Sequence, residues 1–91
     1  TIESLKSFEE AVSNALASRA EGLILDMSRV ILLDSASLEK LIELNDQCRQ
    51  QSRQMKLAGL DETCQKILEI TRLLPQLDTY AELTEAVRSF V

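Results

Sequence analysis

The chain has 91 residues, of which 45% are hydrophobic and 27% are charged. This balance is typical of one small folded domain and excludes a disordered chain, so we expect a single domain over residues 1–91. The 15 acidic and 10 basic residues leave a net charge of −5. We therefore expect no nucleic acid partner, because phosphate binding needs a basic face.

The two cysteines, Cys48 and Cys64, fall on the apolar faces of two predicted helices. This placement predicts buried free thiols and favours a reducing, cytoplasmic compartment. The sequence shows neither a signal peptide nor an apolar run of membrane-spanning length, so direct membrane insertion is not expected.

The first half of the chain predicts a helix and then a buried strand. Apolar residues recur at helical spacing over residues 4–19. Gly22 follows, and then an apolar run, Leu23, Ile24 and Leu25, that closes in Asp26. Such a run without alternation is typical of a parallel strand that is covered on both faces.

A second apolar run, residues 30–33, leads directly into the polar cluster Asp34, Ser35, Ala36 and Ser37. This cluster predicts a helix start with Asp34 as the N-cap. The helix is expected to continue to about Arg53. Its predicted inward-facing residues are Leu38, Leu41, Ile42 and Cys48.

The second half of the chain predicts two more strands and two more helices. Residues 55–59 form the next strand, Asp61 caps a third helix, and residues 77–80 form a short edge strand. Thr79 and Glu82 have the spacing of a capping box for the last helix. The residues of that helix expected to face inward are Leu83, Ala86, Val87 and Phe90.

The alternation of helices and strands predicts an α/β fold, with a mostly parallel sheet, about four helices and right-handed crossovers. Three strands beneath four helices would leave apolar surface poorly covered. We therefore expect one or two further strands on the N-terminal side of Thr1.

Residues for catalysis are scarce. The chain contains no histidine, which excludes Ser-His and Cys-His nucleophile activation and any histidine-ligated metal. Cys48 and Cys64 alone cannot complete a zinc site, and no glycine-rich phosphate loop is present. The sequence therefore predicts a non-enzymatic protein with no catalytic residue, no metal and no cofactor. The cations Arg49, Arg53 and Lys56 are interpreted as solvated charges near a helix end.

The cluster from Asp34 to Ser37 remains as the candidate functional site. Its simplest interpretation is a capped helix start, but ligands and partners often meet α/β folds near the carboxyl ends of strands. A phosphate on a hydroxyl in the first turn would also meet unpaired N–H groups and the positive end of the helix dipole.

Two segments resemble the central motif of STAS domains. LDMSRV, residues 25–30, is similar to the family's strand ending "LDLSxV", and LDSASL, residues 33–38, is similar to its "hhDSSGL" or "hhDTxGL" helix start. MKLAGL, residues 55–60, resembles the strand that follows. The resemblance extends over nearly the whole chain from Phe8 onward, and it implies an α/β fold with strands before the first helix.

The resemblance implies a bacterial-type regulatory protein-interaction module similar to anti-sigma factor antagonists. Its expected partner is a kinase-type anti-sigma factor. The expected binding residues are Asp34, Ser35, Ala36, Ser37, Leu38 and Glu39.

The motif departs from the family at two positions. Ala36 stands where the common antagonists carry their phosphorylated serine, and Ser37 stands where the family has glycine. Ser35 aligns with a second regulatory hydroxyl of the family, so it is the phosphorylation candidate.

The alternative is the cytoplasmic STAS domain of a sulfate-permease-like anion transporter. In that case the partner is the transporter's membrane domain, and this domain lies at the cytoplasmic face of the membrane. A homodimer is compatible with either interpretation. A nucleotide ligand is not favoured, because a phosphate loop is absent.

Overall fold

A parallel sheet of three short strands forms the centre of the fold. The computed structural model describes residues 7–12 and 22–90. Within them the strands are β1 (Gly22–Asp26), β2 (Gln54–Ala58) and β3 (Asp78–Tyr80), in that spatial order, and both neighbouring pairs are parallel. The predicted α/β alternation and parallel sheet are confirmed.

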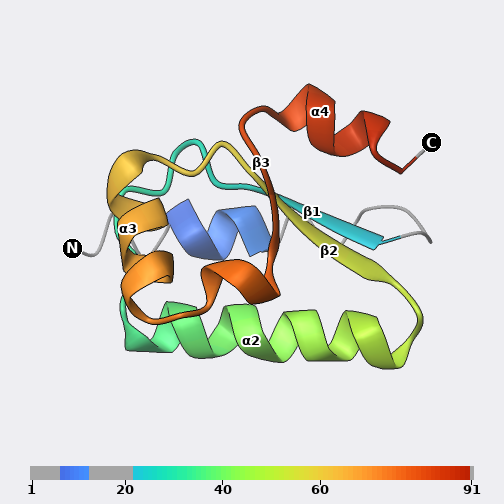
Figure 1. Cartoon of the computed structure of the whole chain (residues 1–91), viewed down its shortest axis with the longest axis horizontal. Helices are drawn as coiled ribbons and strands as arrows, with labels where there is room; N and C mark the ends of the chain where they lie inside the picture. The colour runs from blue at the N-terminus through green and yellow to red at the C-terminus, as the bar shows by residue number, and fades with distance from the viewer. Residues whose placement is uncertain (1–6, 13–21, 91) are drawn as a thin grey trace.

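Helices lie on both sides of this sheet (Figure 1). Residues 7–12 are helical, and of the predicted helix over residues 4–19 the remainder lies outside the described residues. The other elements are α2 (Ser35–Gln50), α3 (Glu62–Ile70), the 3-10 turn η1 (Leu74–Gln76) and α4 (Leu83–Arg88).

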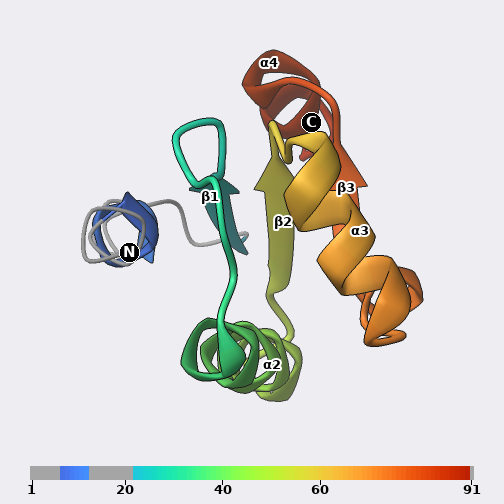
Figure 2. The ribbon, with the colours of Figure 1, turned by 90° about the vertical axis from the view of Figure 1, so that its left-hand side faces the viewer.

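The helices are divided between the two faces and the two edges of the sheet. In both views α2 and α4 lie on opposite sides of the strands, and Figure 2 shows the helical segment 7–12 on the β1 side and α3 toward β3. The site predicted from the sequence therefore lies where the connection after β1 enters α2.

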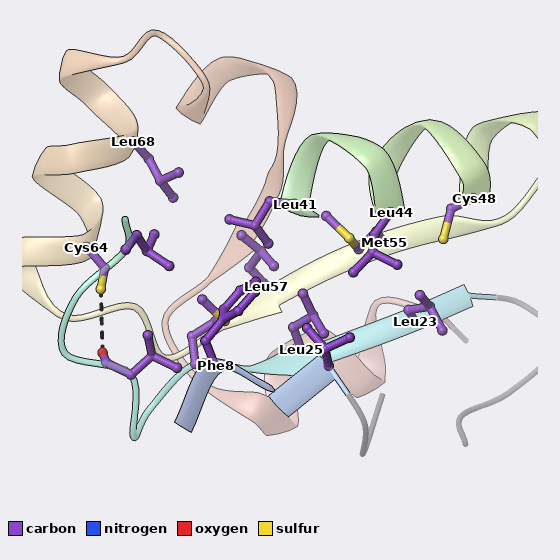
Figure 3. Packing of buried hydrophobic residues seen from close by; sticks show 14 residues of the cluster. Phe8, Leu23, Leu25, Leu41, Leu44, Cys48, Met55, Leu57, Cys64 and Leu68 are labelled. Atoms are coloured by element: carbon purple, nitrogen blue, oxygen red, sulfur yellow. Dashed lines mark hydrogen bonds between the residues drawn. The ribbon is translucent and has the colours of Figure 1, made fainter. Parts of the chain in front are cut away.

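Alternate residues of β1 and β2 build the core against α2. Leu25 and Leu57, which are paired in the sheet, are fully buried and point toward Leu41 and Leu44 (Figure 3). Fully burying each such side chain contributes roughly 1.5–3 kcal/mol. The helical segment 7–12 and α3 add Phe8, Val12, Cys64 and Leu68 to the same cluster.

The inner face of α2 differs in part from the prediction. Leu41 and Cys48 are buried as expected, but Ile42 is 40% exposed and Leu44 is buried in its place. Positions 41, 44 and 48 follow one helical stripe, and Ile42 is rotated about 100° away from Leu41. The helix also ends at Gln50, three residues earlier than predicted.

The start of α4 also differs from the prediction. Thr79 lies inside β3, and the N-cap of α4 is Glu82, whose side chain makes no capping hydrogen bond. The predicted capping box is therefore wrong. Ala86 is buried as expected, but Leu83 is 43% exposed.

Within the described residues, β1 pairs with β2 alone. Further N-terminal strands, which would precede residue 1, stay a prediction. Among the helices of residues 7–12 and 22–90, none has the length and apolar character needed to cross a membrane.

Candidate functional site

The start of α2 is fixed by Asp34, as the sequence predicted. Asp34 has extended backbone geometry, with φ −93° and ψ −179°, and its Oδ1 accepts a hydrogen bond from the backbone N–H of Ser37 at 2.8 Å. The Ser37 hydroxyl donates a second hydrogen bond to the same oxygen, also at 2.8 Å. These two donors hold the pKa of Asp34 below its ordinary value of 3.8. The carboxylate is therefore charged at neutral pH.

The six predicted site residues follow one another at the start of α2 and differ in accessibility. Ser35, Ala36 and Glu39 are exposed, whereas Ser37 is only 4% exposed. Asp34 and Leu38 are half-buried. Three of the six side chains are therefore accessible to a partner that approaches the start of α2.

Ser37 is helical, with its φ outside the left-handed region. The backbone at this position can therefore be formed without the glycine of the family pattern. Its hydroxyl gives the N-cap a second donor that glycine could not supply.

Two exposed apolar residues beside this turn were not predicted from the sequence. Ile31 is 60% exposed and Leu32 is 40% exposed, while their neighbours Val30 and Leu33 are buried in the core. The run 30–33 is uniformly apolar, so its sequence gave no sign of which two residues face solvent. We name the exposed residues Ile31, Leu32, Ser35, Ala36 and Glu39 the α2-start surface.

The three cations interpreted as a solvated group do not share one environment. Arg49 is exposed and Arg53 is half-buried, but Lys56 is buried on the central strand β2. The interpretation of Lys56 as solvated is therefore wrong. Its contacts are described below.

A hollow of about 340 Å³ lies away from the α2-start surface, beside β1. It is lined by Ser7, Glu10, Ala11, Ile24, Asp26, Arg29 and Leu83. The Asp26 carboxylate at its rim accepts a hydrogen bond from the Ser28 N–H at 3.1 Å, which shapes the turn after β1. None of the predicted site residues lines this hollow.

No group of three or more His, Cys, Asp or Glu side chains in the described part of the chain is arranged to hold a metal ion. The two cysteines are separate, buried and free. Burial raises the pKa of Cys64 to about 12, with Asp61 acting in the same direction, and burial also raises the pKa of Cys48.

The fold recurs in a solved structure from Thermotoga maritima, described as that of a candidate anti-sigma factor antagonist. The two chains superpose with a TM-score of 0.76 at 18% sequence identity, and the match covers 97% of this chain and 75% of the other. At this identity the likeness concerns the fold. No curated protein sequence matches the chain.

The sequence pattern of the STAS domain matches residues 1–86, nearly the whole chain, and so includes the strand β1, the start of α2 and the later strands. The match agrees with the resemblance found in residues 25–38 and with the shared fold. The chain therefore belongs to the STAS domain family.

Proposed function

We propose that this STAS domain is a non-enzymatic regulatory module that binds a partner protein through the α2-start surface. The observation that supports the proposal is the exposure of polar and apolar side chains over residues 31–39. Ser35, Ala36 and Glu39 are exposed beside the apolar Ile31 and Leu32. A small apolar patch edged by polar groups is typical of protein interaction sites.

The rigidity of this turn supports the same proposal. The two hydrogen bonds from Ser37 to Asp34 hold the first turn of α2 in one geometry. A partner would then bind a preformed surface, with little loss of conformational entropy. By analogy with the family, the proposed partner is a kinase-type anti-sigma factor.

Phosphorylation of Ser35 is the proposed switch. Its hydroxyl is exposed, Ala36 has none, and that of Ser37 is buried and bonded to Asp34. A phosphate on Ser35 would add about −1.5 to −2 charges at neutral pH. It would stand beside the charged Asp34 and the exposed Glu39. A partner that fits the unmodified surface would then bind less well, because it would meet like charges and would have to remove water from the phosphate.

The binding proposal is tested by titrating a kinase-type anti-sigma factor from the source organism against Ser35→Asp, Ser35→Ala and the wild type. We expect Ser35→Asp to weaken binding by about tenfold or more and Ser35→Ala to change it by less than about threefold. Thr63→Asp is the matched control, because Thr63 is an exposed hydroxyl in the first turn of α3. Equal affinities for Ser35→Asp and the wild type would sink the proposal.

The switch itself is tested by incubating the domain with the same kinase and Mg-ATP. Mass spectrometry should then find one phosphate, on Ser35, and none in Ser35→Ala. A phosphate on Thr63 or on another exposed hydroxyl, with Ser35 unmodified, would contradict the assignment.

The second candidate function is the cytoplasmic STAS domain of a sulfate-permease-like anion transporter. It is favoured by Ala36, which stands where the antagonists carry their phosphorylated serine. Under either proposal the domain faces the cytoplasm. The coding sequence upstream of Thr1 discriminates between them, because the transporter proposal requires a long membrane region there and the free-standing regulator requires none.

A further inference from the structure

A lysine is buried in the middle of the sheet. Lys56 lies on the central strand β2, and its side chain is only 4% exposed. Its neighbours Met55 and Leu57 belong to the core beneath α2, so Lys56 points to the opposite face, toward α4. A buried lysine needs a partner, because an isolated ammonium is very costly to remove from water.

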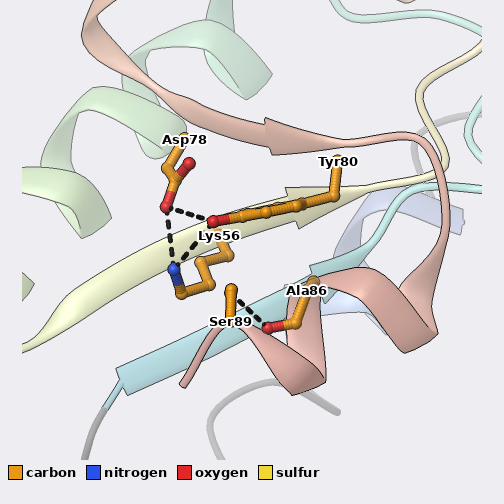
Figure 4. Close-up of polar contacts among 5 residues, drawn as sticks. All are labelled: Lys56, Asp78, Tyr80, Ala86 and Ser89. Carbon is orange, nitrogen blue, oxygen red and sulfur yellow. Dashed lines mark hydrogen bonds and ion pairs between the residues drawn. The ribbon is translucent and has the colours of Figure 1, made fainter. Parts of the chain in front are cut away.

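The partners of Lys56 come from the next strand. Its Nζ donates to Asp78 Oδ2 at 2.9 Å and to Tyr80 Oη at 3.0 Å (Figure 4). The Tyr80 hydroxyl in turn donates to Asp78 Oδ2 at 3.0 Å. The register places Asp78 directly opposite Lys56, and Tyr80 lies two residues further along on the same face. The three polar groups therefore form a closed triangle between β2 and β3.

Two aromatic rings cover the same ammonium group. Nζ lies 5.0 Å from the centre of the Tyr80 ring and 4.8 Å from the centre of the Phe90 ring, which follows α4. Both distances fall within the range of cation–π attraction. The chain has only three aromatic residues, and two of them meet at Lys56. One side chain thus contacts both β3 and the end of α4.

The charge of Lys56 is maintained despite burial. Burial alone would lower the pKa of Lys56, but its hydrogen bonds to Asp78 and Tyr80 outweigh that effect and raise the pKa above the ordinary value. The ammonium stays protonated throughout the physiological range.

Apart from the pairing of β3 with β2, the C-terminal segment, residues 78–90, buries few side chains. Ala86 is its one buried residue, β3 has three residues and α4 has six. The α4 start lacks a side-chain cap, and the Ser89 hydroxyl donates within α4, to the Ala86 carbonyl at 2.6 Å. Such a segment, with few buried apolar contacts, belongs to the least stable part of a domain.

We propose that Lys56 is a latch that holds the C-terminal segment on the sheet, so that β3 and α4 open together, ahead of the rest of the domain, when the latch is broken. The latch goes beyond the proposed function, since it lies on the opposite face of β2 from the core that supports α2. Its physical basis is that one ammonium group takes its hydrogen bonds from β3 and a further ring contact from Phe90, which follows α4.

The chemistry of a buried charge makes this proposal testable. Removing the partner of a buried charge is strongly destabilising, whereas replacing the whole pair by apolar groups is often neutral. Asp78→Asn should therefore open the segment, and adding Lys56→Met should close it again, because methionine fills much of the space of the lysine side chain without a charge. A segment held by packing alone would show no such recovery.

The experiment is hydrogen–deuterium exchange of the full chain, with the rates of residues 78–90 compared with those of α2. We expect Asp78→Asn to raise exchange in residues 78–90 by about tenfold or more, and Lys56→Met with Asp78→Asn to return it to within about threefold of the wild type. Lys40→Met is the control, because it removes an exposed ion pair with Glu43 at 3.7 Å. Exchange in this control should match the wild type throughout.

Tyr80→Phe keeps the test decisive if Asp78→Asn does not fold. It removes the two hydrogen bonds of the Tyr80 hydroxyl from the triangle but keeps the ring and the bond between Lys56 and Asp78, so exchange should rise moderately and only within residues 78–90. The proposal is overturned by unchanged exchange in that segment, by a rise of equal size in α2, or by a double variant that fails to recover.

Discussion

Ser35 and Ser37 lie two residues apart at the start of α2, and their hydroxyl groups have opposite environments. Ser37 is buried and bonded to Asp34, whereas Ser35 faces solvent. The Ser37 hydroxyl thus stabilises the fold, and the Ser35 hydroxyl is available to a partner or a kinase.

Ser37→Ala should lower the free energy of unfolding by about 1 kcal/mol, because it removes one of the two hydrogen bonds to the Asp34 cap and leaves the backbone one in place. Ser35→Ala should change it by less than about 0.5 kcal/mol, as for other exposed positions. Urea unfolding followed by circular dichroism measures both. Equal effects of the two substitutions would contradict the different roles assigned to the two serines.

The capping carboxylate predicts a dependence of stability on pH. The pKa of Asp34 in the folded protein lies below its ordinary value of 3.8, owing first to the Ser37 N–H and then to the Ser37 hydroxyl. The ionised cap therefore stabilises the fold above that value, and the stabilisation is lost as pH falls through the folded-state pKa.

Asp34→Ala should accordingly be less stable than the wild type at about pH 7, and the difference should shrink at about pH 2. Thermal unfolding at the two pH values measures it. Asp34→Asn, which keeps an acceptor without the charge, is the control. Its stability should change less between the two pH values than that of the wild type. A difference that grows in acid would contradict the assignment.

At the scale of the elements, the link from β2 to α3 depends on a glycine. Gly59 has φ +75°, in the left-handed region, and a Cβ there would lie 3.1 Å from the Cβ of Ser28. Its N–H donates to the Tyr80 carbonyl at 3.0 Å, so the turn also joins β2 to the end of β3. Backbone conformation and close packing both favour glycine at this position.

Gly59→Ala should therefore lower the free energy of unfolding by about 1–3 kcal/mol. Adding Ser28→Gly removes the Cβ contact but leaves the strained φ and the approach to the Cα and N of residue 28 at 3.3 Å, so it should recover only part of the loss. Urea midpoints of the two variants separate the two causes. Full stability in Gly59→Ala would show that this turn tolerates a side chain.

The starts of α2 and α3 were predicted correctly, and the start of α4 was not. Asp61 caps α3 by accepting from the Cys64 N–H at 2.8 Å, as Asp34 does for α2. These caps depend on residues three positions apart, which the sequence displays directly. Thr79 has the same local spacing to Glu82, but pairing with β2 places Thr79 in a strand. A contact between distant segments overrides the local signal there.

At the scale of the whole molecule, Cys48 and Cys64 report on the integrity of the core. Both were predicted to be buried free thiols, and the structure confirms this. The Cys64 thiol donates to the Val30 carbonyl at 3.5 Å, and its pKa of about 12 leaves very little thiolate at neutral pH.

Both thiols should therefore resist alkylation by iodoacetamide in the native protein and react as the domain unfolds. The urea midpoint of labelling should coincide with that of the circular dichroism signal if unfolding is two-state. Stoichiometric labelling without urea would contradict the closed core.

The sequence by itself determined the fold class, the family and two of the helix starts. These follow from periodicity, capping chemistry and a motif, all of which are local along the chain. Tertiary structure alone decided which apolar residues of the run 30–33 and of α2 face solvent, because exposure depends on what packs against each helix face or loop.

Lys56 shows the difference most clearly. Its flanking residues correctly predicted a strand, but the lysine was interpreted as solvated. Its carboxylate partner Asp78 lies 22 positions away, and the Phe90 ring lies further still. Only the pairing of β2 with β3 and the placement of α4 bring these groups together. The charge can be buried because the folded chain supplies its hydrogen bonds, and no local pattern in the sequence carries that information.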